Sequence, residues 1–234
     1  MINVPNEINF LLSNIRAFLS FKIKYFIAKI LKGHYFINKN ISNYLINNNK
    51  AKIHYGSTFH IPGFFNSQII GKNPIDITKK TPFENDSINT IFSTHVIEHL
   101  HKNQIIFFLK ECYRVLEPDG VNIIMTPSLS KIIKILYLNN DSKNKEFLLL
   151  RQKKWEKENH LNSCSYLNGI FRNYGHRFIL DFDFIEFEAK KIGYKDIRVC
   201  DNNNTPDKEI NSYIKEKKND VSWNLETETF LLFK

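Results

Sequence analysis

From residue 52 onward, short apolar segments alternate with longer amphipathic ones, and this alternation constrains the fold more than any other feature. The apolar segments have the length of strands, as at residues 87–94 and 121–125. Residues 102–116 instead repeat apolar side chains at the spacing of one helix face. Strands that alternate with helices imply a mostly parallel sheet with helices on both of its faces. We therefore expect an α/β fold.

The same patterns give the individual elements. Seven strands are expected, at residues 52–55, 66–70, 74–77, 87–94, 121–125, 196–200 and 229–233. A second helix is expected to begin at Asp181 or Asp183 and to end before Gly193, because Asp favours the first position of a helix and Gly the position after its end. Ligands of such folds bind at the carboxyl ends of the strands. That rim should hold Gly56, Gln68, Asp76, His95 and Thr126.

The N-terminal region has a different pattern. Residues 8–32 contain no Pro or Gly and are dense in Phe, Leu and Ile, which predicts a helical arm. The arm either packs on the main domain, which is the commoner use of an apolar helix face, or lies as a basic amphipathic anchor on an anionic membrane surface. The Asn-rich residues 38–50 are expected to form a linker. The chain then divides into an arm and linker (1–50) and a main domain (51–234).

Charge and cysteine content narrow the partners and the location. The chain has 33 basic and 24 acidic residues and a formal net charge of +9, which can attract nucleic acid or anionic lipid. Most of the basic residues are Lys, whereas Arg is the residue best suited to reading bases, so we expect no nucleic-acid partner. The three cysteines are widely spaced, and the sequence has no export signal and no long apolar span. These features predict a cytoplasmic protein. Peripheral contact with a membrane through residues 8–32 remains an alternative.

Several motifs in the main domain resemble one known family. They are Ile75-Asp76-Ile77-Thr78, Thr81-Pro82-Phe83-Glu84, His95-Val96-Ile97-Glu98-His99-Leu100, Glu111-Cys112-Tyr113-Arg114-Val115-Leu116-Glu117-Pro118-Asp119-Gly120 and Gly175-His176-Arg177-Phe178. Together they are similar to class I S-adenosylmethionine-dependent methyltransferases, most of all to the bacterial type 11 branch. The resemblance runs from about residue 52 to the end of the sequence. It implies a Rossmann-like, mostly parallel seven-stranded sheet flanked by helices, with S-adenosyl-L-methionine as the cofactor.

The resemblance also implies roles for individual residues. The turn Gly56-Ser57-Thr58 corresponds to the part that holds the methionine moiety of the cofactor, and Gln68 to the ribose-binding position. Asp76 and Ile77 correspond to the adenine-contacting loop, and His95 lies beside the sulfonium and the acceptor. Thr58 replaces a family glycine and Gln68 replaces a family carboxylate. The alternative to an enzyme is therefore a catalytically inactive relative of these methyltransferases. Such a protein would act in binding or as a scaffold, with or without peripheral attachment to the membrane.

Methyl transfer requires mainly that the acceptor be held in line with the methyl group, and a hydroxyl acceptor also benefits from a base. His95 and His176 are the candidate bases, each with a purely structural role as the alternative. The function expected is methylation of a small molecule or glycan, at oxygen. Nothing in the sequence names the acceptor, and residues 128–175 are expected to form a helical lid over it.

One motif admits a second interpretation. Residues 95–99 match the H-x-x-E-H pattern of inverted zinc peptidases, in which two histidines four residues apart bind zinc. The pattern is short and the sequence offers no evident third ligand, so we expect no metal. Glu98 and His99 are instead expected to cap and orient a helix that begins near Leu100.

Overall fold

The computed structural model describes residues 34–69, 73–138, 141–153, 161–202, 204–217 and 225–234. The predicted arm at residues 8–32 lies outside the described residues. No helix among the described residues is long and apolar enough to cross a membrane.

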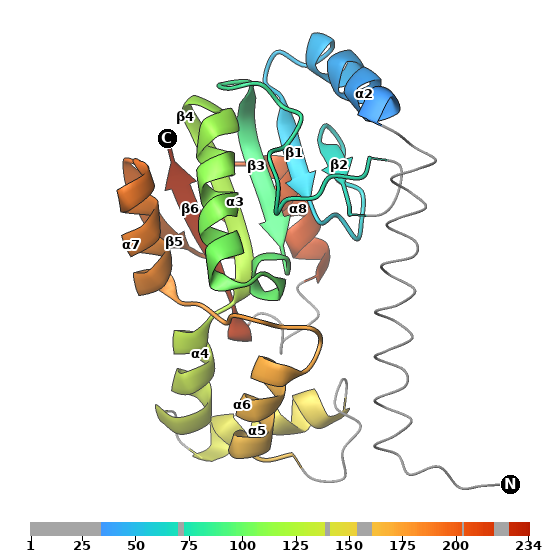
Figure 1. The fold of residues 1–234 in the computed structure, drawn as a ribbon. Helices are drawn as coiled ribbons and strands as arrows, with labels where there is room; N and C mark the ends of the chain where they lie inside the picture. Colours follow the sequence, from blue (N-terminus) through green and yellow to red (C-terminus); the bar gives the residue numbers. More distant parts are fainter. Residues whose placement is uncertain (1–33, 70–72, 139–140, 154–160, 203, 218–224) are drawn as a thin grey trace, which may run out of the picture.

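The described residues form one six-stranded mixed sheet, which is the frame of the α/β fold (Figure 1). The first four strands in spatial order are parallel, and the last two are each antiparallel to their neighbour. Because β6 runs in the opposite direction, its first residues lie at the carboxyl ends of the parallel strands. The spatial order is β2 (Phe65–Ser67), β1 (Lys52–Tyr55), β3 (Ile88–Thr94), β4 (Leu116–Pro127), β6 (Thr227–Phe233) and β5 (Asp196–Cys200).

Of the seven predicted strands, six are present among the residues that the structure describes, and the strand predicted at residues 74–77 is not formed. The segment 74–77 makes a single parallel bridge, between Gln68 and Pro74. Pro74 has no N–H group to donate to a ladder. Two residues later, the Asp76 carboxylate accepts hydrogen bonds from Thr78 N and Thr78 Oγ1, which turns the chain away from the sheet.

Two helices predicted from the sequence cover one face of the sheet. They are α3 (Lys102–Val115) and α7 (Phe182–Ile192), which lie side by side in Figure 1. Asp181 accepts a hydrogen bond from Phe184 N at the start of α7, and Gly193 has a φ of 118° at its end. Both termini of α7 are therefore confirmed.

Two further helices were not predicted. Helix α2 (His34–Ile46) includes most of the segment expected as a linker, so that expectation is wrong for residues 38–46. Its Ile41 is buried in the main core. Helix α8 (Lys208–Lys217) covers the second face of the sheet, where Ile210 and Ile214 pack with strand residues.

The segment between β4 and α7 is helical, as expected for residues 128–175. It contains α4 (Leu129–Ile133), a π-helical turn (Lys134–Leu138), α5 (Asp141–Arg151) and α6 (Ser163–Arg172). These helices have a small core of their own, which includes Ile132, Phe147 and Tyr166. Figure 1 shows them beyond the carboxyl ends of β1 and β3, on the side where ligands bind in such sheets.

Candidate functional site

His95 lies at the rim of the sheet, directly after β3. Its backbone N–H donates to Met125 O at 2.9 Å, so the residue stands beside the end of β4. The backbone φ of His95 is 52°, a left-handed conformation that is uncommon for a residue other than Gly. Strain of this kind is often found at functional sites. Here it sends the chain out of the sheet and into the short helix η1 (Ile97–His99).

The imidazole of His95 is held by a buried carboxylate. His95 Nδ1 is 3.1 Å from Glu98 Oε1, and Thr126 Oγ1 donates to Glu98 Oε2 at 3.0 Å. The side chain of Glu98 is fully buried, whereas that of His95 is 32% exposed. Thus the charged partner is inside the protein and the imidazole reaches the surface of the rim.

The state of Glu98 determines which nitrogen of His95 carries a proton. Burial raises the pKa of the Glu98 carboxyl, but the hydrogen bond from His95 and the attraction of His95 and His99 outweigh it, and the pKa lies below its ordinary value. An ionised carboxylate only accepts hydrogen bonds, so His95 Nδ1 is the donor. In the neutral imidazole Nε2 is then the proton acceptor, and it lies 3.5 Å from Thr227 Oγ1.

The turn after β1 approaches this rim closely. Gly56 has a φ of 67°, and a Cβ atom at this position would lie 2.2 Å from Cγ2 of Val96. Only glycine therefore fits between β1 and the residue that follows His95. The next residue, Ser57, donates its N–H to Ser67 O at 2.8 Å, which joins the ends of β1 and β2.

A cavity of about 630 Å³ opens beside this turn. Three predicted cofactor residues line it, Ser57, Thr58 and Gln68, together with aromatic side chains that include Tyr44 and Phe59. Its volume is within the range of roughly 300–1,000 Å³ that holds small organic ligands. Aromatic faces and neutral polar groups suit a nucleoside. Gln68 was expected at the ribose and Ser57 and Thr58 at the methionine moiety, and all three line this one cavity.

The remaining predicted cofactor residues do not line that cavity. Asp76 is engaged with Thr78 and forms an ion pair with Lys79 at 3.0 Å. Ile77 packs against the main hydrophobic core. Gly56 and His95 are on the rim, as described above. The structure therefore separates the predicted set into a cavity group and a rim group.

Comparison with known proteins assigns a domain. Residues 32–124 of the chain match the family model described as a methyltransferase domain, of type 11. This segment therefore carries a methyltransferase domain. The cofactor of such domains is S-adenosyl-L-methionine, and the α/β sheet of the chain has the Rossmann-like arrangement with mixed strands. A search of curated proteins finds no match.

Solved structures of methyltransferases resemble the chain at low identity. A SAM-dependent methyltransferase from Archaeoglobus fulgidus is 12% identical, with 90% of this chain and 99% of that chain covered and a TM-score of 0.45. One from Thermotoga maritima is 11% identical, with 97% of each chain covered and a TM-score of 0.44. Phosphoethanolamine N-methyltransferase 2 from Haemonchus contortus is 14% identical over 79% of this chain, with a TM-score of 0.45. The methyltransferase spans 48% of the length of that Haemonchus chain.

His176, the second candidate base, lies in the loop between α6 and α7 of the methyltransferase. Its Nδ1 is 2.7 Å from Ile170 O, and because a carbonyl only accepts, Nδ1 is the donor. Burial lowers the pKa of His176, so its neutral form is favoured. The imidazole of His176 contacts that of His99, with ring centroids 5.0 Å apart.

The expectation that Glu98 and His99 cap the following helix is wrong. They belong to η1, and the N-cap residue of α3 is His101. The Glu98 carboxylate orients His95 and Thr126 instead.

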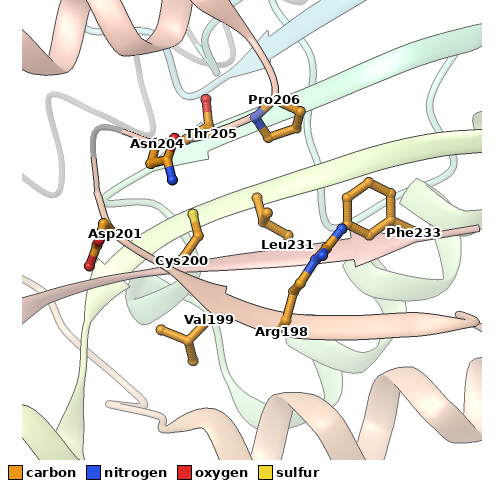
Figure 2. Close-up of a pocket in the computed structure, with 9 residues that line it drawn as sticks. All are labelled: Arg198, Val199, Cys200, Asp201, Asn204, Thr205, Pro206, Leu231 and Phe233. Atoms are coloured by element: carbon orange, nitrogen blue, oxygen red, sulfur yellow. The ribbon is translucent and has the colours of Figure 1, made fainter.

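A second cavity of the methyltransferase, of about 610 Å³, lies at the β5 edge of the sheet, opposite the β2 edge (Figure 2). It is lined by β5, β6 and the loop that follows β5, and it holds no residue of the predicted site. Figure 2 shows the Arg198 side chain extended toward the ring of Phe233, with its guanidinium 4.8 Å from the ring centroid. The same guanidinium is 3.3 Å from Asp196, so its charge is already partnered. We assign no ligand to this cavity.

A buried polar group, which was not predicted from the sequence, joins helices α5 and α6 to the start of β6. Glu226, directly before β6, accepts hydrogen bonds from Arg151 at 3.2 Å and from the hydroxyl of Tyr166. All three side chains are buried. Charged residues are rarely buried without a partner. Here Arg151 and Tyr166 lie 75 and 60 positions before Glu226 in the chain, so no local sequence pattern indicates that these residues meet.

Proposed function

We propose that this methyltransferase transfers a methyl group from S-adenosyl-L-methionine to an oxygen of a small-molecule or glycan acceptor, with His95 as the general base. The observation that carries the proposal is the pairing of His95 with the buried Glu98 at the rim. A fixed imidazole with one nitrogen on a carboxylate and the other toward the site is the arrangement that enzymes use to remove a proton from a hydroxyl.

The protein's contribution to the chemistry is mainly positional. When bound, S-adenosyl-L-methionine supplies an activated methyl group, and the rate then depends on holding the acceptor in line with it. In our proposal Ser57, Thr58 and Gln68 hold the cofactor, since they line the cavity beside the turn after β1. His95 Nε2 takes the hydroxyl proton, and Glu98 keeps the imidazole oriented and stabilises the imidazolium that results.

The lid helices complete the proposed acceptor site. They lie beyond the carboxyl ends of the strands (Figure 1), and the hydrogen bond between Arg151 and Glu226 fixes α5 to the start of β6. A helical cover at this position excludes water and sets which acceptor fits.

The test begins with the cofactor. Calorimetry of the full chain with S-adenosyl-L-methionine should give micromolar-range binding, and no binding at millimolar cofactor would overturn the proposal. Methyl-tritiated cofactor is then incubated with a panel of sugar nucleotides, free sugars and phenols, and label in an acceptor identifies the substrate class.

A base can be distinguished from a binding residue by substitution. His95→Gln should lower the rate of methyl transfer by roughly 100- to 10,000-fold while cofactor affinity changes less than about threefold. His60→Gln is the contrasting variant, since His60 lines the proposed cofactor cavity, and it should change cofactor affinity rather than the rate at saturating cofactor. A His95→Gln enzyme that keeps the wild-type rate contradicts the role of His95 as base.

One observation favours a second candidate, a catalytically inactive relative that acts as a binding protein. The Gln68 side-chain amide donates to Ser57 O, so the altered turn satisfies part of its own hydrogen bonding. The Gln68 side-chain oxygen is left as a neutral acceptor, weaker than a carboxylate, for a ribose hydroxyl. Absence of cofactor binding, with a folded protein, would favour this candidate. Sedimentation with anionic vesicles, with and without residues 1–33, would then test membrane attachment.

A further inference from the structure

Glu98, His99 and His176 bring three metal-ligating side chains together. One ligand atom from each residue can be chosen so that all three lie within 4.8 Å of one another. In a tetrahedral zinc site with bonds of about 2.0–2.2 Å, two ligand atoms lie roughly 3.3–3.6 Å apart. The three ligand atoms must therefore move closer together, by up to about 1.5 Å, to bind one ion.

The free lone pairs of this group point to a ligand set. His176 Nδ1 donates to Ile170 O, which fixes the tautomer and leaves Nε2 as the ligating nitrogen. The Glu98 carboxylate accepts hydrogen bonds from His95, from Thr126 and from its own backbone N–H. An ionised carboxylate has about four acceptor positions, so one remains for a metal ion.

The backbone holds the two segments of the group in place without a metal. Arg177 N and Phe178 N both donate to Glu98 O, at 2.8 and 3.2 Å, so the loop that carries His176 is attached to η1. Gly175 has a φ of 79°, and a Cβ there would lie 3.7 Å from His99 Nδ1. This preorganisation lowers the conformational cost of binding an ion.

We propose that Glu98, His99 and His176 form a binding site for one divalent transition-metal ion of the zinc type, which ties the α6–α7 loop to the rim of the sheet. Two imidazoles and one carboxylate suit zinc, and three protein ligands leave a fourth position for water. The inference does not rest on the proposed methyl transfer, because metal binding is measured directly.

The proposal departs from the expectation that the chain binds no metal. The H-x-x-E-H pattern offered His95 and His99 as the two ligands, and of these only His99 belongs to the proposed site. Glu98, inside the same pattern, and His176, 77 positions beyond His99, are the other two ligands. His95 is not a ligand, because its Nδ1 is already bonded to Glu98. The sequence alone gives no sign that these two segments meet.

The experiment measures zinc binding by the untagged full chain after treatment with a chelator. Competition with a chromophoric chelator should show about one equivalent of tightly bound Zn²⁺. His99→Ala and His176→Ala should each weaken binding at least about 100-fold, since loss of a ligand costs more than loss of an outer partner. His60→Ala, an exposed histidine elsewhere, should bind as the wild type does.

A gain-of-signal variant keeps the test decisive if an alanine variant does not fold. In His176→Cys, Co²⁺ should produce the strong thiolate-to-cobalt charge-transfer absorption that appears only when residue 176 is a ligand. The proposal is wrong if the wild type binds less than about 0.2 equivalents at tenfold excess zinc, if folded alanine variants bind normally, or if His176→Cys lacks the cobalt band. Cofactor affinity, measured separately, reports on the proposed function alone.

Discussion

Gly56 and Gly63 share a left-handed backbone but not the same surroundings. Their φ angles are 67° and 77°, yet a Cβ at Gly56 would lie 2.2 Å from Val96, whereas nothing lies within 4 Å of a Cβ at Gly63. Gly63→Ala should cost about 1 kcal/mol, for backbone strain alone. Gly56→Ala should cost about 3 kcal/mol, because overpacking against a stiff side chain is added.

Urea denaturation of both variants measures this difference. The double variant Gly56→Ala, Val96→Ala should recover part of the loss, since it removes the clash and leaves the strain. Equal costs for the two glycine variants would show that Val96 yields and that the close approach is not restrictive.

Single residues were predictable where their role is local. Helix α7 begins after Asp181 and ends before Gly193, as expected, because capping depends on neighbours in the sequence. Gln68 was expected to face a ribose. The hydrogen bond that its amide donates to Ser57 O was not predicted, because it joins two different turns. The carboxylate that orients His95 also escaped prediction, although Glu98 is three residues away, because nothing local shows that its side chain turns back and is buried.

At the scale of elements, the buried pair Arg151–Glu226 connects α5 to the start of β6. The two side chains are 6% and 4% exposed, so solvent screens them little. Glu226→Gln should lower the free energy of unfolding by about 3 kcal/mol, because it leaves the Arg151 charge without its counterion in the interior. The exposed pair Lys190–Glu186 on α7 is the control, and Glu186→Gln should change stability by less than about 0.5 kcal/mol.

A double-mutant cycle separates the ion pair from other effects of Glu226→Gln. Arg151→Met with Glu226→Gln should be more stable than Glu226→Gln alone, since the unpaired charge is removed. If the two substitutions are simply additive, the pair is not coupled and α5 is held to β6 by apolar contacts instead.

Helix α8 shows why some elements escaped the sequence analysis. Ile210, Tyr213 and Ile214 follow the spacing of one helix face, but the segment is short and otherwise polar. Helix α2 escaped for a similar reason, because its many Asn residues favour turns and caps. In both, tertiary packing of a few apolar residues decides the structure, as the burial of Ile41 and Ile214 shows.

For the molecule as a whole, the alternation of strands and helices predicted the α/β class and a mostly parallel sheet, but neither the order of the strands nor the reversal of β6. The reversal of β6 is decisive for the site, because it brings Thr227 within 3.5 Å of His95 Nε2. The register of β6 on β4 sets this contact, and it arises from pairing between residues 100 or more positions apart. Periodicity reports which face of a strand is buried and carries no information on its partner.

Buried titratable groups predict how the stability of the whole molecule depends on pH. His54, in the third position of β1, is packed between the rings of Phe59 and Phe92, and burial lowers its pKa to about 4. The unfolded chain binds a proton at His54 near pH 6.5, whereas the folded chain does so only near pH 4. Between these values the unfolded state therefore holds more protons, and stability falls as the pH falls, by up to about 3 kcal/mol from this residue.

The dependence is tested by measuring the free energy of unfolding in urea between pH 7.5 and 4.5. His54→Leu should be less sensitive to acid than the wild type in this window, whatever its stability at pH 7.5. Some slope should remain, because burial also lowers the pKa of His176. Below pH 4.5 both proteins should lose further stability, since the hydrogen bond and charge of Arg114 hold the pKa of Glu111 below its ordinary value against the effect of burial. Parallel curves for the two proteins between pH 6.5 and 4.5 would mean that His54 is protonated as readily in the folded chain as in the unfolded one, and hence that water reaches the core beside β1.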